Sequence, residues 1–95
     1  MRTIELTRFR VAADKVDQLL AARPQMIEDF RADREGFVDA RLVRLSDDQW
    51  LDIVTWESER DFAASRAKAA NLSGIKTFFD SIDEIISAEH GACFS

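Results

Sequence analysis

The segment Trp50–Trp56 (WLDIVTW) constrains the fold most, because it is typical of a strand with apolar side chains on both faces. Successive side chains of an extended strand point to opposite faces of a sheet. The segment therefore divides into two sets of side chains, which are Trp50, Asp52, Val54 and Trp56 on one face and Leu51, Ile53 and Thr55 on the other. Both sets are largely apolar, so we expect the sheet to be covered on both sides.

The first third of the chain predicts a strand followed by a long helix. Residues 3–11 alternate apolar and polar side chains and include β-branched and aromatic residues, which favours a strand. From Asp14, the expected N-cap, apolar residues recur at helical spacing as far as Phe30. Pro24 should kink this helix or restart it at a first turn, and Gly36 should end it.

The middle of the chain predicts a hairpin and the start of another helix. Residues 37–45 form a strand, and the turn formers at 46–49 (SDDQ) join it to the strand at 50–56. Ser58, followed three residues later by Asp61, resembles a capping box and should open the helix.

The last third predicts an interrupted helix and a final strand. The helix contains Phe62 and an alanine-rich body, breaks at residues 71–74, and resumes for about two turns up to Ile82. Residues 83–95 are typical of a strand, broken near Gly91.

The resulting order, β-α-β-β-α-β, is that of the ferredoxin-like split unit, an α+β fold with a four-stranded antiparallel sheet. Residues 1–95 are short enough to form a single domain. Both helices should cover one face of the sheet and leave the other bare. That apolar face favours a homodimer in which two sheets pack against each other.

Composition excludes several classes of protein. With 46% hydrophobic and 33% charged residues, the chain is globular. Thirteen basic against eighteen acidic residues give a net charge of −5, which argues against nucleic acid as a partner. No apolar run reaches the length of a membrane span, and the start MRTIELTRFR lacks the apolar core of a signal peptide. We therefore expect a soluble cytoplasmic protein with no membrane partner.

Motifs for cofactor-assisted chemistry are missing from the sequence. It has no glycine-rich phosphate loop, no G-x-S-x-G elbow, no H-E-x-x-H and no paired metal ligands. Its one cysteine, Cys93, cannot form an internal disulfide or anchor a zinc site alone. We expect no cofactor and no metal, which agrees with a cofactor-free enzyme and equally with a protein that is not an enzyme.

Two groups of residues carry a resemblance to a known family. Trp56-Glu57-Ser58 ends a strand ahead of Phe62, and Gly36-Phe37-Val38 stands five residues before Leu42-Val43-Arg44. This pattern resembles the antibiotic biosynthesis monooxygenases, which are dimeric α/β barrels, from Ile4 to about Ala88. The resemblance implies a homodimer whose sheets form a central barrel, with a pocket between sheet and helices in each subunit.

The resemblance also implies a reaction. In the quinone-forming branch of the family, oxygen is inserted into an anthrone-type aromatic without flavin, haem or metal, and the substrate supplies the electrons. The protein binds the aromatic, removes or stabilises a proton and excludes water.

The family's residues map onto this chain one by one. Trp56 matches the tryptophan of the motif, Asp52 stands where the quinone-forming branch has an asparagine, and Phe62 stands where it has a tyrosine. Lys76 is the nearest match to an arginine of the second helix. The haem-degrading branch needs a second tryptophan and a histidine on that helix, and residues 61–79 contain neither, so haem degradation is not expected.

Asp52 is the most informative candidate. A carboxylate among apolar residues is costly to bury without a partner. It either forms a salt bridge with Arg41 or Arg44 of the neighbouring strand, or acts as a general base whose pKa its surroundings raise.

The other candidates also have two interpretations. Trp56 and Trp50 either contact a flat substrate or fill the core. Arg66 and Lys76 either hold an anionic substrate or face water. His90 has the chemistry for proton transfer near neutral pH, or is solvated.

We expect a cofactor-independent monooxygenase that oxidises a small electron-rich aromatic, such as an anthrone, a quinol or a polyketide-type phenol. Trp56 and Phe62 would shape the pocket with Trp50 at its rim, Asp52 would take the proton, and Arg66 or Lys76 would stabilise the anion. The alternatives are a non-catalytic ligand-binding or accessory dimer and an isomerase or cyclase on the same scaffold.

Overall fold

The computed structural model describes residues 1–95, and its elements follow the expected order. The strands are β1 (Thr3–Arg10), β2 (Phe37–Arg44), β3 (Gln49–Trp56) and β4 (Glu84–Ala92). The helices are α1 (Val16–Asp33), α2 (Glu59–Lys68) and α3 (Ser73–Asp80), and a short 3-10 turn, η1 (Ala13–Lys15), leads into α1.

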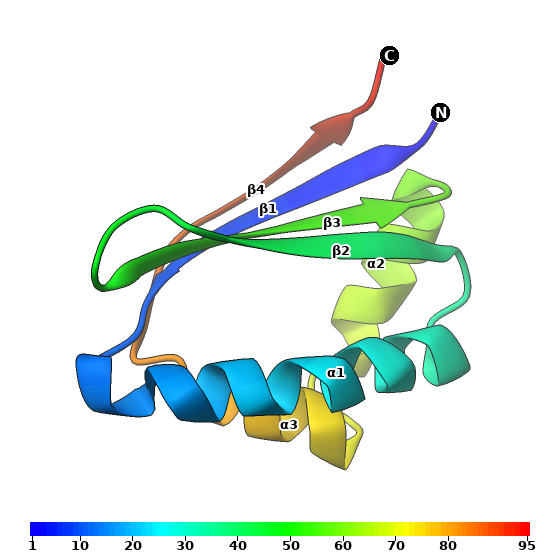
Figure 1. Ribbon diagram of the computed structural model, residues 1–95. Coiled ribbons are helices and arrows are strands. Elements are labelled where there is room, and N and C mark those ends of the chain that lie inside the picture. Colours follow the sequence, from blue (N-terminus) through cyan, green and yellow to red (C-terminus); the bar gives the residue numbers. More distant parts are fainter.

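The four strands form one antiparallel sheet in the order β2-β3-β1-β4. All three helices lie on the same face of this sheet, with α1 and α3 side by side and α2 at the far end (Figure 1). The α+β, ferredoxin-like prediction is confirmed. The opposite face of the sheet carries no layer of its own within the chain.

The long helix differs from the prediction at its start, and of the two alternatives predicted for Pro24 the restart does not occur. Asp14 is not its N-cap: it lies in the 3-10 turn, and α1 begins after Lys15 without a side-chain cap. Pro24 does not restart the helix, which runs as one element from Val16 to Asp33. Pro24 removes a bond to the carbonyl of Leu20, and both residues are exposed, so water can replace that bond.

Two of the predicted boundaries are confirmed. The Ser58 hydroxyl accepts a hydrogen bond from the Asp61 amide at 3.1 Å and so caps α2. Gly36 lies between α1 and β2 with φ +78°, and a Cβ there would meet the Asp61 side chain at 2.1–2.5 Å. Gly91, in contrast, does not break the last strand, because β4 continues through it to Ala92 in register with β1.

The core lies between the sheet and the helices. It consists of twelve buried residues, which are Phe9, Val11, Leu19, Ala22, Met26, Phe30, Trp50, Val54, Trp56, Phe62, Ile75 and Phe78. None of the three helices combines the length and the apolar character that a membrane-spanning helix needs.

Candidate functional site

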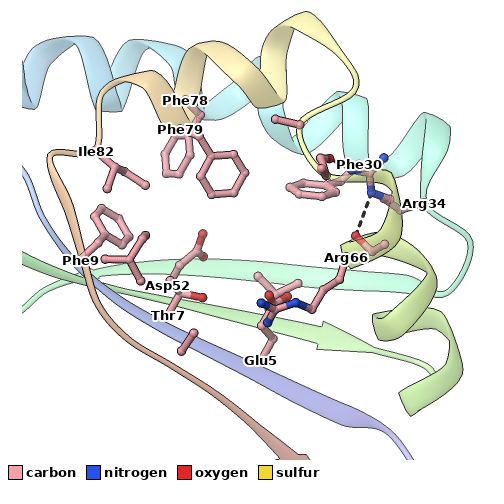
Figure 2. Close-up of a pocket in the computed structure, with 16 residues that line it drawn as sticks. Glu5, Thr7, Phe9, Phe30, Arg34, Asp52, Arg66, Phe78, Phe79 and Ile82 are labelled. Carbon is pink, nitrogen blue, oxygen red and sulfur yellow. Dashed lines mark hydrogen bonds between the residues drawn. The ribbon is translucent and has the colours of Figure 1, made fainter.

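A cavity of about 370 Å³ opens beside this core, between the sheet and α3. Ten of its sixteen lining residues are hydrophobic. Figure 2 shows Thr7 and Asp52 pointing from the strands toward Phe78 and Phe79 of α3. A volume at the lower end of the usual range of about 300–1,000 Å³, with few polar groups, suits a small organic ligand.

The polar groups of the lining are few and come from both layers. They are Glu5 and Thr7 on β1, Asp52 on β3, Arg34 next to the end of α1, and Ser65 and Arg66 on α2.

Glu5 is a lining residue whose carboxyl pKa is raised by its surroundings. Trp56 Nε1 donates a hydrogen bond to Glu5 Oε1 at 3.0 Å. Burial raises the pKa of Glu5, and the negative charge of Asp52 adds to this, while the Trp56 bond and the charges of Arg66 and His90 oppose it.

Glu5 was not predicted as a site residue from the sequence. Because Ile4 and Leu6 are apolar and alternate with Glu5, the pattern suggested that Ile4 and Leu6 face the core and that Glu5 faces solvent. One signal was available: Glu5 shares a strand face with Phe9, which is fully buried under the helices.

Asp52 lines the pocket and is only 7% exposed. Its partner is neither Arg41 nor Arg44 but Arg23 of α1, whose Nη1 and Nη2 donate to Oδ2 and Oδ1 at 2.7 and 2.8 Å. Arg44 instead lies over the Trp50 ring and bonds to carbonyls of the hairpin loop. Asp52 points toward the helices, so a helix supplies its counter-ion.

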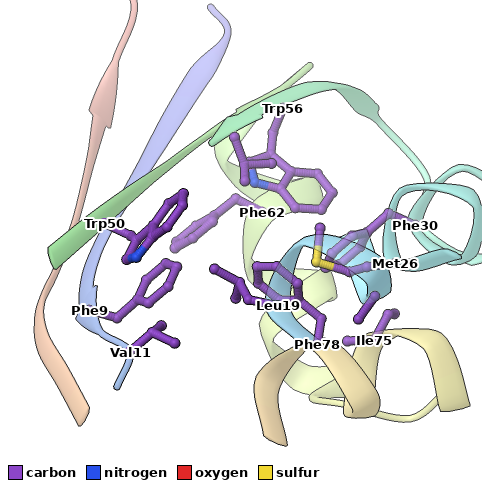
Figure 3. Close-up of a cluster of buried hydrophobic side chains, with 12 residues drawn as sticks. Phe9, Val11, Leu19, Met26, Phe30, Trp50, Trp56, Phe62, Ile75 and Phe78 are labelled. Carbon is purple, nitrogen blue, oxygen red and sulfur yellow. The ribbon is translucent and has the colours of Figure 1, made fainter. Parts of the chain in front are cut away.

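The three aromatic candidates belong to the core rather than to the pocket lining (Figure 3). Trp56 is 1% exposed and packs edge-on against Phe30 and Phe37. Trp50 is also buried, and its indole N–H has no hydrogen-bond partner. Trp56 contacts the pocket lining through its bond to Glu5 and through its packing against Phe30.

The two basic candidates lie in different places. Arg66 lines the pocket, and its guanidinium lies 5.6 Å from the centre of the Phe62 ring. Lys76 is exposed, pairs with Asp80 at 2.9 Å and does not line the pocket. Arg66 is therefore the predicted cation that the fold brings to the cavity.

Arg34 is a buried cation that was not among the predicted site residues. Its guanidinium donates to Ser65 Oγ, Asp33 Oδ2, Asn71 Oδ1 and the Ala69 carbonyl, at 2.6–2.8 Å. These bonds use four of its five donors, so Arg34 fixes the connection between α2 and α3 at the wall of the pocket.

His90 and Cys93 lie on and just after the edge strand. The His90 ring stacks on Phe62 with centroids 4.5 Å apart, and its Nε2 is 4.0 Å from Glu59. Cys93 is a free thiol. No group of three or more potential ligands is arranged to hold a metal ion.

Together these residues make a mainly apolar cavity with two carboxylates and two arginines at its wall. Such an arrangement can bind a small planar molecule, accept a proton from it and stabilise the resulting anion.

Comparison with known families and structures is consistent with this geometry. The sequence model of a family described as antibiotic biosynthesis monooxygenase matches residues 3–74. No curated protein matches the sequence closely enough to name a relative.

Several solved structures share the fold. A Bordetella bronchiseptica protein, provisionally named an antibiotic biosynthesis monooxygenase, has a TM-score of 0.81 at 15% identity, over 99% of this chain and 98% of that chain. Rv0793 from Mycobacterium tuberculosis has a TM-score of 0.73 at 16% identity, over 100% and 97%. SnoaB, a cofactor-independent oxygenase from Streptomyces nogalater, has a TM-score of 0.62 at 21% identity, over 95% and 88%.

Proposed function

The chain belongs to the antibiotic biosynthesis monooxygenase family, and from this premise we propose that it oxidises a small electron-rich aromatic with dioxygen and without an added cofactor. The substrate class is an anthrone or quinol of the polyketide type. The observation that carries the proposal is the cavity itself, which is mainly apolar and has Glu5, Asp52 and Arg66 in its wall. The fold shared with SnoaB supports it.

The proposed reaction balances with the substrate as reductant. A ring CH2 flanked by aromatic rings loses a proton, and the electron pair left on carbon reduces dioxygen. One oxygen atom forms the new C–O bond, and the CH2 becomes a carbonyl after its second hydrogen is lost. The other oxygen atom leaves as water, so four electrons pass from the substrate to one dioxygen.

Each pocket group has a part in this proposal. A wall carboxylate, Asp52 or Glu5, accepts the proton, and Arg66 stabilises the negative charge that develops on the substrate oxygen. Phe62 holds the Arg66 guanidinium by stacking. The core around Trp56 excludes water from one end of the cavity.

We also propose that the protein works as a homodimer. Ile4, Leu6, Leu51 and Ile53 lie on the sheet face that no helix covers. A second copy of this sheet would bury them, as the family resemblance implies.

Dioxygen uptake tests the proposed activity. The protein, freed of metal ions by chelation, is mixed with a panel of anthrones and hydroquinones, and the uptake is compared with spontaneous oxidation. Arg66→Met keeps an unbranched apolar stem but loses the charge, so we expect uptake to fall at least about tenfold. Lys76→Met, which removes a cation outside the pocket, should keep the wild-type rate.

Two outcomes would contradict the oxygenase proposal. If Arg66→Met and Lys76→Met changed dioxygen uptake by the same factor, the reaction would take place outside this pocket. If the wild type showed no uptake above background across the panel but bound the same compounds, the protein would be a ligand-binding dimer instead.

A further inference from the structure

The two wall carboxylates are not equivalent. Both Asp52 oxygens accept hydrogen bonds from Arg23, at 2.7 and 2.8 Å, and Asp52 is buried in the wall of the pocket. This two-bond ion pair joins α1 to β3 and occupies both carboxylate oxygens of Asp52, so neither oxygen is free to accept a proton from a ligand.

Glu5 has the opposite arrangement. It accepts one side-chain hydrogen bond, from Trp56 to Oε1, and Oε2 has no hydrogen-bond partner in the chain. No cation lies within ion-pair distance of it, although Arg66 is at the same end of the pocket (Figure 2). Oε2 of Glu5 is therefore free to accept a hydrogen bond or a proton from a ligand.

The groups around Glu5 come from three elements. Trp56 and Asp52 face it from β3, Arg66 from α2 and His90 from β4. Burial outweighs the favourable contacts and raises the pKa of Glu5. A carboxylate of raised pKa is a stronger base than an exposed one, which suits proton removal from a weakly acidic substrate.

His90 is the cross-strand neighbour of Glu5 and is partly exposed to solvent. The register places His90 directly opposite Glu5 on the neighbouring edge strand, so the two side chains share the helix-facing side of the sheet. Phe62 stacks on the His90 ring, and 45% of the His90 side chain is exposed. Histidine side chains exchange protons readily near neutral pH.

We infer that Glu5, and not Asp52, accepts the substrate proton, and that His90 passes this proton to solvent. The inference rests on the proposed function, because it names the base of that reaction. In the step, the substrate C–H bond breaks, its electron pair stays on carbon and the proton bonds to Glu5 Oε2. The proton then moves to the His90 imidazole and on to water, which restores the Glu5 carboxylate.

The test measures proton removal apart from oxidation. An anthrone is incubated with the protein in D2O without oxygen, and exchange of its CH2 protons is followed by NMR. We expect Glu5→Gln to slow the protein-catalysed exchange at least about 100-fold. The glutamine carbonyl still accepts the Trp56 N–H, so the fold is kept, as circular dichroism would check.

Matched variants separate the base from its surroundings. Glu28→Gln, an exposed carboxylate of α1 outside the pocket, should exchange at the wild-type rate. Asp52→Asn should lose less than Glu5→Gln. His90→Gln should slow exchange at low buffer and be rescued by added imidazole, a rescue that a structural role would not produce.

Three results would overturn the inference. They are wild-type exchange no faster than the solution background, Glu5→Gln exchange within threefold of wild type, and Asp52→Asn with an intact fold losing as much as Glu5→Gln. Exchange that depends on Glu5 without dioxygen uptake would support the inference and contradict the oxygenase proposal, so the two failures are distinguishable.

Discussion

At the scale of single residues, Glu5 couples stability to pH. Its pKa is raised above the ordinary value of 4.5, mainly by burial. Between the pKa of Glu5 in the unfolded chain and its higher pKa in the folded chain, the folded chain binds more protons than the unfolded chain. The free energy of unfolding therefore falls as the pH rises through that window. Glu5→Gln lacks this titration. The unfolding free energy of the variant minus that of the wild type should therefore increase from pH 4.5 upward.

Urea unfolding at a series of pH values measures this difference. Hydrogen bonds from Asn71 and Lys15 lower the pKa values of Asp33 and Asp83, and stability from these two groups is lost on acidification. Both groups are present in wild type and variant, so they cancel in the difference. A difference for Glu5→Gln that stays constant with pH would show that burial does not perturb the pKa of Glu5.

The two tryptophans of β3 form a natural comparison. Both are buried, but Trp56 donates to Glu5 and Trp50 donates to nothing. Trp56→Phe and Trp50→Phe remove the same atoms, so the packing losses are similar. We expect Trp56→Phe to cost about 1.5–3 kcal/mol more, since it alone breaks a bond to a charged group. Equal midpoints in urea unfolding would rule out a contribution from the Glu5 bond.

At the scale of elements, the Arg23–Asp52 pair joins α1 to β3 with little exposure to water. Removing one partner leaves the other charge buried and unpaired. Arg23→Met should therefore lower the free energy of unfolding by about 3–5 kcal/mol. Chemical denaturation measures the loss.

A double variant isolates the charge from the packing. Arg23→Met combined with Asp52→Leu removes both charges and should recover most of the loss. If the double variant is as unstable as Arg23→Met alone, the cost lies in the packing of the Arg23 stem and not in an orphaned carboxylate.

Most of the element order was predictable because it depends on local periodicity. The strand at 50–56 and the Ser58 cap follow from neighbouring residues, and both were predicted from sequence. The helix does not restart at Pro24 and the last strand does not break at Gly91, because both residues are exposed. Water can satisfy the backbone group that Pro24 leaves unbonded, and Gly91 lies on an edge strand.

The site was less predictable, since it depends on which elements face each other. The alternation of side chains along residues 50–56 placed Asp52 on the same face as the two tryptophans. Arg66 was predicted as a substrate-binding residue, and both residues line the pocket. The ion pair with Arg23 and the bond from Trp56 to Glu5 join residues 29 and 51 positions apart. No local pattern reports contacts of that separation.

At the scale of the whole molecule, one face of the sheet has no cover. Leu6 lies opposite Ile53 and Arg8 opposite Leu51, which places an apolar patch at the centre of that face. Charges of both signs border the patch, including Arg41 and Glu89. Two copies related by a twofold axis can bury the patch and bring opposite charges together.

We expect the wild type to sediment as a dimer at micromolar concentration. Ile53→Lys places a charge at the centre of the patch and should give a folded monomer, because a buried unpaired ammonium opposes association. Leu20→Lys makes the same kind of change on the exposed side of α1 and should leave the dimer intact. A wild-type monomer would refute the sheet-to-sheet assembly, and an Ile53→Lys dimer would move the interface elsewhere. Since the pocket opens on the helix side, the monomer should retain Glu5-dependent exchange, which would separate assembly from chemistry.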